Sequence, residues 1–401
     1  MNKFISSFKK EEVLIGAILF SLPITFGLNS IIIVFTTLFF LYKTIKKGNF
    51  KALIIYYASF SFFTAQFISY LLSNNRQEAA VKLLLYSSFL LFPISFAYLS
   101  ANKIKLNEKT IFKYLFYGTL MILIYGSFRF LYDVIFLDEL YDYGRAVALL
   151  LKYIPHHIYM SMFILISIYA IFLGKIENND NKKSVYVLPL LYLFLILLGS
   201  RMAILLGLII LPIFLLKKLN GKENQKKIII LGSFLMLIFI TIGFSNDFVR
   251  DKMLHSYYDV FNIATKEKPF SGISFRQKIW RAAVNLISQS PFWGYGIGDV
   301  QEALNNTYKS TDVKGLNAHN QYFQFILNYG LVICLMLFFF TFKVVKQCIL
   351  NKQSILFFSW LILLFFCLTE SILNRQWGVV LFAFILNFSI YSQNKSLRTN
   401  E

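Results

Sequence analysis

The sequence of 401 residues is poor in the side chains that build metal centres and disulfide frameworks. It has only three cysteines, and Cys334, Cys348 and Cys367 lie in or beside apolar runs without the spacing of a metal site or a disulfide framework. It has 20 acidic residues against 40 basic ones, and they form no acidic cage for a metal ion. No metal and no cofactor are therefore predicted.

Hydrophobic residues, by contrast, make up 57% of the chain and lie in long unbroken runs. A helix needs about 20 mostly apolar residues to cross the hydrocarbon core of a bilayer, and by this criterion the runs predict an all-α polytopic membrane protein with about 12 transmembrane helices. The predicted spans are residues 12–28, 29–42, 52–72, 81–101, 111–136, 157–174, 185–199, 202–216, 228–244, 319–342, 354–369 and 377–392.

Lysines orient the predicted spans, because cytoplasmic loops of membrane proteins carry an excess of basic residues. The excess fits a chain whose N- and C-termini are both cytoplasmic. Residues 1–244 then form nine spans, residues 245–318 one large periplasmic loop, and residues 319–401 three more spans and a cytoplasmic tail. Lysine clusters on both sides of residues 185–216 predict two short spans joined by a tight turn at Gly199-Ser200-Arg201, rather than one long helix.

The net charge of +20 would by itself suggest a nucleic-acid partner. Most of this charge is lysine in segments predicted to be cytoplasmic, where it lies beside anionic lipid headgroups. No nucleic-acid-binding module is recognisable, so no nucleic-acid partner is predicted.

Arginines follow a different pattern from lysines, because most of them fall on the predicted outer side. Those residues are Arg76, Arg145, Arg201, Arg250, Arg276, Arg281 and Arg375. A guanidinium group offers a fixed fork of donors that suits phosphate and stays charged when partly desolvated. The pattern predicts an outward-facing site for a phosphate-bearing ligand. The structural alternative is that these arginines pair with local acids or with lipid headgroups.

The large loop has internal order. Residues 276–289 predict an amphipathic helix that lies along the membrane interface. Its predicted apolar face is Ile279, Trp280, Ala283, Val284 and Ile287, and its predicted polar side is Arg276, Gln277, Lys278 and Arg281. Pro291 is expected to end this helix. The run Gly294, Gly296 and Gly298 predicts a tight turn where the backbone approaches a ligand or a neighbouring helix.

Titratable residues lie at the predicted outer ends of several spans. His319 opens one span, and an imidazole at the mouth of a cavity can take a proton from a sugar hydroxyl near neutral pH. The structural alternative is an interfacial histidine capped by Asn320. His157 lies at another outer boundary, and Glu370, in the loop 369–376, could orient an arginine or a histidine.

Four segments in the second half of the chain share the predicted outer side. They are Leu198-Gly199-Ser200-Arg201; Arg276 with Ile279-Trp280, Pro291 and the glycine run; Ala318-His319-Asn320 with Tyr322 and Gly330; and Glu370-Ser371. Their order and spacing, over roughly residues 185–390, resemble the O-antigen ligase and O-antigen polymerase superfamily, which are membrane glycosyltransferases of the bacterial envelope.

This resemblance implies a GT-C-like fold in the bacterial inner membrane with a periplasmic active site. It implies a glycan donor on undecaprenyl diphosphate, a lipid A-core sugar or another glycan as acceptor, and membrane lipids as further partners. The implied catalytic residues are His319 as general base and Arg201 and Arg276 on the leaving diphosphate. The remaining substrate-binding candidates are Arg145, His157, Arg281, Tyr322, Glu370 and Arg375.

Other classes of function stay open at the level of sequence. A repeat-unit polymerase differs from a ligase only in its acceptor, and the single large loop leans toward a ligase. A transporter of lipid-linked sugars would predict internal duplication and broken helices near the midplane, and no repeat is visible. A non-catalytic scaffold would leave the outer arginines unexplained.

Overall fold

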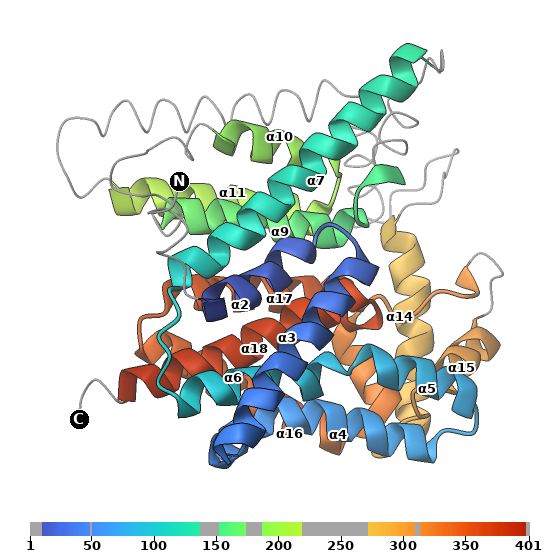
Figure 1. Cartoon of the computed structure of the whole chain (residues 1–401). Helices are drawn as coiled ribbons and strands as arrows, with labels where there is room; N and C mark the ends of the chain where they lie inside the picture. The colour runs from blue at the N-terminus through green and yellow to red at the C-terminus, as the bar shows by residue number, and fades with distance from the viewer. Residues whose placement is uncertain are drawn as a thin grey trace, which may run out of the picture. The chain divides into compact units, whose positions relative to one another are not determined.

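The computed structural model describes residues 10–48, 50–136, 152–173, 187–218, 272–308 and 313–397. Within these ranges the regular elements are all helices, and no strand is present. The chain divides into two compact units, each described here by itself, whose helices are labelled in Figure 1. The first unit consists of Met1–Thr25 with Asn107–Ser271, and the second of Phe26–Leu106 with Gly272–Glu401.

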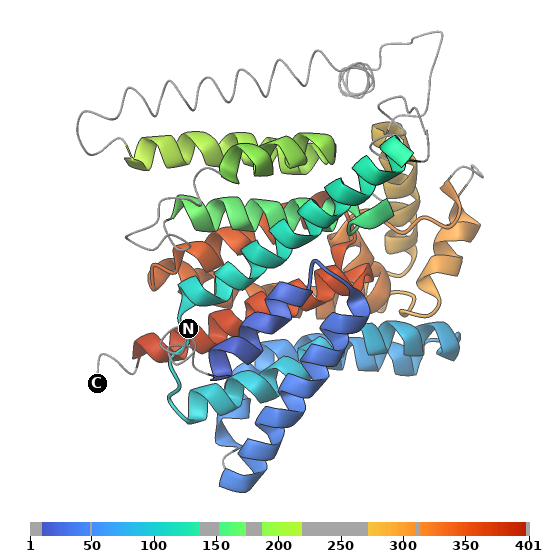
Figure 2. The ribbon, with the colours of Figure 1, turned by 45° about the horizontal axis from the view of Figure 1, so that its top comes forward.

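The first unit contains five helices within the described residues. These helices are α2 (Lys10–Ser21), α7 (Glu108–Phe136), α9 (His157–Phe172), α10 (Leu188–Leu197) and α11 (Arg201–Lys218). A Cβ atom on Gly118 of α7 would lie 2.1 Å from the carbonyl oxygen of Phe20, so only glycine fits there. Helices α9, α10 and α11 pack against one another in the same unit (Figure 2).

The second unit is built around one buried helix. Its described elements are α3 (Phe26–Lys47), η1 (Lys51–Tyr56), α4 (Tyr57–Leu72), α5 (Arg76–Leu85), α6 (Ser88–Ala101), α14 (Gly272–Gln289), α15 (Val300–Thr307), α16 (Gln321–Leu350), α17 (Ser354–Thr369), η4 (Ile372–Asn374) and α18 (Gln376–Leu397). Residues 379–386 of α18 are at most 3% exposed, because α6, α16, α17 and η4 surround the helix. A helix that is apolar on every side is stable in such a position.

Helix α16 bends sharply at Gly330, whose backbone (φ 79°, ψ 169°) is not helical. The bend frees backbone groups of α16, and the loop after α14 binds them. Tyr295 N–H donates to the Leu327 carbonyl at 2.7 Å, and Leu331 N–H donates to the Pro291 carbonyl at 2.8 Å. The predicted glycine turn is therefore confirmed as a close approach to a neighbouring helix.

The helix boundaries agree with most predicted spans and correct the boundary between the first two. The predicted boundary between spans 12–28 and 29–42 is wrong, because α2 ends at Ser21 and α3 begins at Phe26. Pro23 lies in the intervening turn, and proline interrupts a helix by its missing N–H group and its ring. The predicted span 81–101 lies within one candidate span, Arg76–Ala101, which consists of α5 and α6 separated by a two-residue turn. The predicted span 228–244 lies outside the described residues.

The predicted turn at Gly199-Ser200-Arg201 is confirmed. Helix α10 ends at Leu197 and α11 begins at Arg201. Gly199 has a φ of 61°, a left-handed conformation that glycine adopts at little cost. The chain between Leu188 and Lys218 is therefore two short helices and not one long one.

Five helical segments in the described part of the chain are long and apolar enough to cross a membrane. They are Phe26–Lys47, Lys51–Leu72, Arg76–Ala101, Glu108–Phe136 and Gln321–Leu350. Three shorter apolar helices accompany them, namely His157–Phe172, Leu188–Leu197 and Ser354–Thr369. The chain is thus a helical membrane protein, while the total of about 12 spans and the periplasmic position of the large loop stay predictions.

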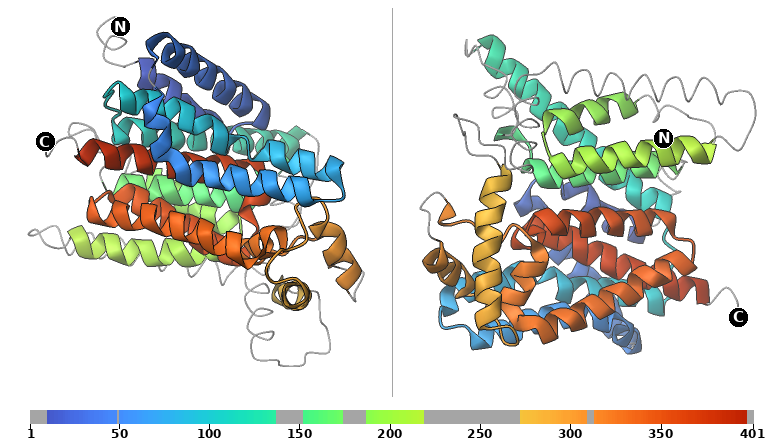
Figure 3. Two further views of the ribbon diagram at one scale, coloured as in Figure 1. Left: turned by 90° about the horizontal axis from the view of Figure 1, so that it is seen from below. Right: turned by 180° about the vertical axis from the view of Figure 1, so that it is seen from behind.

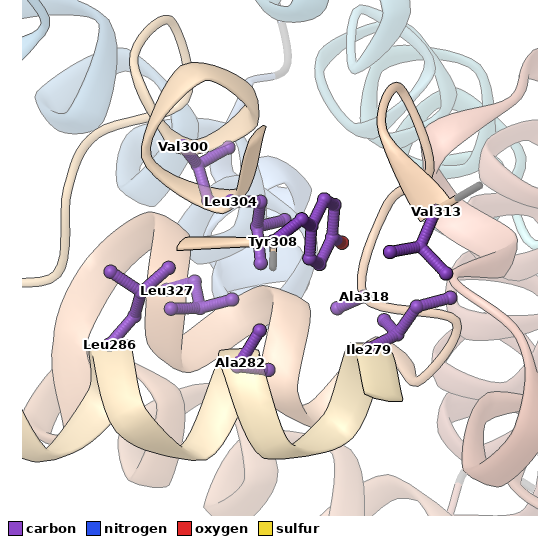
Figure 4. Packing of buried hydrophobic residues seen from close by; sticks show 10 residues of the cluster. Ile279, Ala282, Leu286, Val300, Leu304, Tyr308, Val313, Ala318 and Leu327 are labelled. Atoms are coloured by element: carbon purple, nitrogen blue, oxygen red, sulfur yellow. The ribbon is translucent and has the colours of Figure 1, made fainter. Parts of the chain in front are cut away.

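The predicted amphipathic helix is present as α14, but its buried face differs from the prediction. Ile279, Ala282, Ala283 and Leu286 are buried, and they pack against α15 and the start of α16 (Figure 4). Val284, predicted on the apolar face, is 52% exposed, because it points away from this cluster. Helix α14 runs across the direction of α16, α17 and α18, near one end of them (Figure 3).

Candidate active site

His319 lies in the short turn that precedes α16. Its φ of 43° is unusual for a residue with a side chain and is held by its neighbours. The His319 N–H donates to the Asn317 side chain at 2.9 Å, and the Trp280 indole N–H donates to the His319 carbonyl at 3.4 Å. The side chain of Asn320 then caps α16 by accepting from the N–H groups of Tyr322 and Phe323.

Glu370 binds the imidazole of His319. It follows the last residue of α17, and its Oε2 atom lies 2.8 Å from His319 Nδ1. The Glu370 side chain is only 14% exposed. Burial by itself raises the pKa of this carboxyl, but the hydrogen bond and charge of His319, together with the charge of Arg276, hold the pKa below its ordinary value.

Arg276 completes the group from the first turns of α14. One terminal N–H donates to Glu370 Oε1 at 2.5 Å, and Nε–H donates to the Thr369 carbonyl at 3.3 Å. A guanidinium group has five N–H donors, so three remain for another partner. The side chain is 28% exposed, which leaves part of it accessible. The three residues Arg276, Glu370 and His319 therefore form one charged cluster.

Hydrogen bonds between the start of α16 and the end of α17 fix this cluster. Asn320 Nδ2 donates to the Leu368 carbonyl at 3.0 Å, and the Tyr322 hydroxyl donates to the Leu364 carbonyl at 2.9 Å. The N–H of Leu373 donates to Gln321 Oε1 at 2.7 Å. The two segments that carry His319 and Glu370 are therefore held together by three bonds besides the ionic ones. Tyr322 is predicted to bind substrate, but its hydroxyl hydrogen is used in the bond to the Leu364 carbonyl.

The arrangement determines which nitrogen of His319 is available for chemistry. An ionised Glu370 accepts a hydrogen bond from Nδ1–H, which leaves the lone pair on Nε2. A carboxylate in this position fixes the tautomer and the ring orientation, and it stabilises the imidazolium that forms when Nε2 takes a proton. The cluster can therefore serve as an oriented general base beside a cation.

Two other predicted site residues lie in the second unit, outside the contacts of this cluster. Arg281, on α14, and Arg375, directly after η4, are exposed. Arg201 begins α11 and His157 begins α9, and both belong to the first unit, so their approach to His319 stays a prediction. Arg145 lies outside the described residues.

Two contributors to the cluster were not predicted in these roles. Trp280 was expected to anchor α14 in the membrane interface, yet its indole N–H bonds to the backbone of His319. Asn317 was not predicted as a site residue, and its side chain holds the His319 N–H. An asparagine two residues before a histidine at a helix start is a recognisable turn signal. The partner of Trp280, by contrast, is 39 residues away in sequence.

No group of three or more histidines, cysteines or acids that could hold a metal ion occurs in the part of the chain that the structure describes. The three cysteines are free and buried. The cluster around His319 contains one carboxylate, one imidazole and one guanidinium, which is a set suited to proton transfer and anion binding.

Residues 185–339 match the model of a protein family described as O-antigen ligase. This stretch of the chain is similar to that family, and it contains Arg201, Arg276 and His319, whereas Glu370 lies beyond its end. The match confirms the resemblance seen in the sequence and supports a function of the O-antigen ligase or polymerase type. Comparison with curated proteins finds no match for the chain.

Proposed function

We propose that the protein transfers a glycan from undecaprenyl diphosphate to a sugar hydroxyl of lipid A-core at the periplasmic face of the bacterial inner membrane. The observation that carries this proposal is the contact of His319 Nδ1 with Glu370, which in turn binds Arg276. An oriented base beside a guanidinium, in a chain that is similar to the O-antigen ligase family, matches the needs of glycosyl transfer from a lipid diphosphate.

In the proposed reaction the acceptor hydroxyl loses its proton to Nε2 of His319. The acceptor oxygen forms a bond to the anomeric carbon while the bond from that carbon to the diphosphate oxygen breaks. The electron pair of the broken bond leaves with the diphosphate, and the transition state has oxocarbenium character. A direct displacement of this kind inverts the anomeric configuration.

Arg201 and Arg276 are proposed to stabilise the negative charge that grows on the leaving diphosphate. The three free donors of Arg276 support this role. The diphosphate linkage stores the driving force, so the reaction needs no ATP, and no metal ion or cofactor is proposed. Arg145, His157, Arg281 and Tyr322 remain proposed contacts to the donor or the acceptor.

The glycans of a deletion strain test this function and its alternatives. A ligase predicts that long glycan chains disappear from lipid A-core while lipid-linked polymer accumulates. Lipid A-core that carries a single repeat unit would instead indicate a polymerase. Unchanged surface glycan together with blocked flipping would indicate a transporter and would contradict glycosyl transfer.

A further inference from the structure

A groove of about 620 Å³ lies in the second unit, bounded by α3, α5, α6 and the residues that follow η4. One part of its lining is apolar and contains Ile33, Val34, Val81, Leu84, Leu85 and Leu91. Another part is polar and contains Ser30, Glu78, Lys82, Asn374, Arg375 and Gln376. A volume of this size is typical of a site for a small ligand.

The polar part of the groove carries one unbalanced positive charge. Lys82 pairs with Glu78 at 3.3 Å and donates to the Ile297 carbonyl at 2.9 Å. Gln376 donates to the Ser30 hydroxyl at 2.5 Å. The Arg375 guanidinium, which is exposed, makes no ion pair or side-chain hydrogen bond to any residue that the structure describes. One guanidinium thus remains available at the polar part of the groove.

The apolar part of the groove belongs to helices that can cross a membrane. Val34 lies in the candidate span Phe26–Lys47, and Leu84 lies in the candidate span Arg76–Ala101. Val34 is 47% exposed, Val81 63% and Leu84 72%. Exposed aliphatic side chains on membrane helices are stable in contact with hydrocarbon and not with water. The groove therefore offers an alkyl-binding wall that continues into a cationic part.

We infer that the groove binds one anionic phospholipid of the surrounding bilayer, with its phosphate on Arg375 and an acyl chain along Val34 and Leu84. The net charge of the polar part supports this choice. Lys82 is balanced by Glu78, so a single positive charge matches the single negative charge of a phosphodiester. A diphosphate carries more negative charge and would place it close to Glu78.

The bound phospholipid would also affect glycan transfer, and this part of the inference rests on the proposed function. Arg375 and Glu370 lie on one short segment, and Leu373, between them, is bonded to Gln321 near the start of α16. A phosphate that holds Arg375 restrains this segment and thereby the carboxylate that orients His319. Anionic phospholipid therefore promotes transfer by keeping Glu370 in place.

Lipid retention tests the binding site without any glycan substrate. Wild type, Arg375→Gln and the control Lys105→Gln are reconstituted in nanodiscs of phosphatidylcholine and phosphatidylglycerol, and native mass spectrometry counts the lipids that remain bound. Lys105 is exposed in the turn between α6 and α7, outside the groove. Wild type and Lys105→Gln are expected to retain phosphatidylglycerol, and Arg375→Gln to retain about tenfold less because it loses a charge-assisted hydrogen bond.

A second variant separates lost binding from misfolding. Leu84→Trp fills the groove from an exposed position and keeps Arg375, and it is also expected to lower phosphatidylglycerol retention. Equal retention by Arg375→Gln and Lys105→Gln overturns the inference. Retention of added undecaprenyl phosphate in place of phosphatidylglycerol overturns the assignment to a bilayer phospholipid.

The rate of glycan transfer is measured in the same nanodiscs. Phosphatidylglycerol is expected to stimulate transfer by wild type and by Lys105→Gln several-fold, and not by Arg375→Gln. Equal stimulation of all three proteins overturns the link to Glu370. If wild type transfers no glycan in any lipid, the proposed function fails, whereas lipid retention still decides whether the groove binds a phospholipid.

Discussion

The Glu370 carboxylate accepts hydrogen bonds from a side chain on α14 and from one in the turn before α16, and each of its oxygens has its own partner. Oε1 binds Arg276, and Oε2 binds His319. A buried carboxylate is stable in this state because the positive charge of Arg276 and the hydrogen bonds offset the cost of removing it from water. The residue therefore links the base to the cation.

His319→Ala is expected to abolish transfer. The variant lacks the group that accepts the proton of the acceptor hydroxyl, and a general base accelerates a reaction by roughly 10²–10⁴-fold. Transfer is measured with membranes that contain equal amounts of the inserted protein. Trp280→Phe serves as a milder comparison, because it removes the bond to the His319 carbonyl and keeps an aromatic ring at this position. Full transfer by His319→Ala would remove His319 from the chemistry.

Glu370→Gln is expected to lower stability by roughly 2–4 kcal/mol at neutral pH, because charge-assisted hydrogen bonds to Arg276 and His319 are lost. The pKa of Glu370 is lowered in the folded protein relative to its ordinary value of 4.5. This stabilisation is fully present above that value and is lost as the pH falls through the lowered pKa.

Thermal unfolding in detergent at a series of pH values measures this effect. The difference in unfolding temperature between wild type and Glu370→Gln is expected to be constant from neutral pH to about 5 and to shrink at lower pH. A difference that does not change down to strongly acidic pH would show that the carboxylate charge contributes nothing.

At the scale of elements, the bend of α16 is the feature that determines where the glycine loop binds. The non-helical backbone of Gly330 leaves carbonyl and N–H groups of α16 without partners in the helix, and the loop that contains Pro291 and Tyr295 forms hydrogen bonds with them. An α-helix whose bonds are interrupted is stable only when other partners satisfy its backbone groups. The bend and the loop therefore depend on each other.

Gly330→Ala is expected to destabilise the protein by roughly 2–4 kcal/mol. A Cβ atom at Gly330 would lie 1.9 Å from the Phe292 carbonyl oxygen, and the φ of 79° is itself unfavourable for alanine. Gly27→Ala is the matched control, because a Cβ there meets nothing within 4 Å. Unfolding temperatures of the two purified variants give the comparison, and equal values for both would show that the bend is not required.

The helices also show which features of the fold can be predicted from sequence patterns. Apolar runs located most helices, because length and hydrophobicity alone determine whether a segment can be a membrane span. The spacing of apolar residues in 276–289 predicted the helix α14 correctly, but it placed Val284 on the buried face, whereas this side chain is exposed. A helical wheel permits several neighbouring stripes, and the side chains of α15 and α16 decide which stripe is buried.

At the scale of the whole molecule, the distribution of lysines predicts the orientation of the chain in the membrane. Residues around Lys105 are predicted to be cytoplasmic, and those around Arg281 to be periplasmic. Both side chains are exposed, so each position is accessible to a reagent on its own side. The orientation determines whether the cluster around His319 can meet a donor in the outer leaflet.

Cysteine labelling tests this orientation directly. The three native cysteines are buried, which keeps the background low. A membrane-impermeant thiol reagent is expected to modify Arg281→Cys in cells with a permeabilised outer membrane, and Lys105→Cys only after the inner membrane is also opened. Labelling in the reverse order would invert the topology and would exclude a periplasmic active site.

By itself the sequence determined that this chain is a helical membrane protein, and it located the break before Arg201 and the span that follows His319. These features are local, because they depend on hydrophobic length and on the glycine and charge pattern within one segment. Only the tertiary structure joined Arg276, His319 and Glu370, since their contacts connect positions up to 94 residues apart. Contacts of that kind depend on how helices pack, which no single segment specifies.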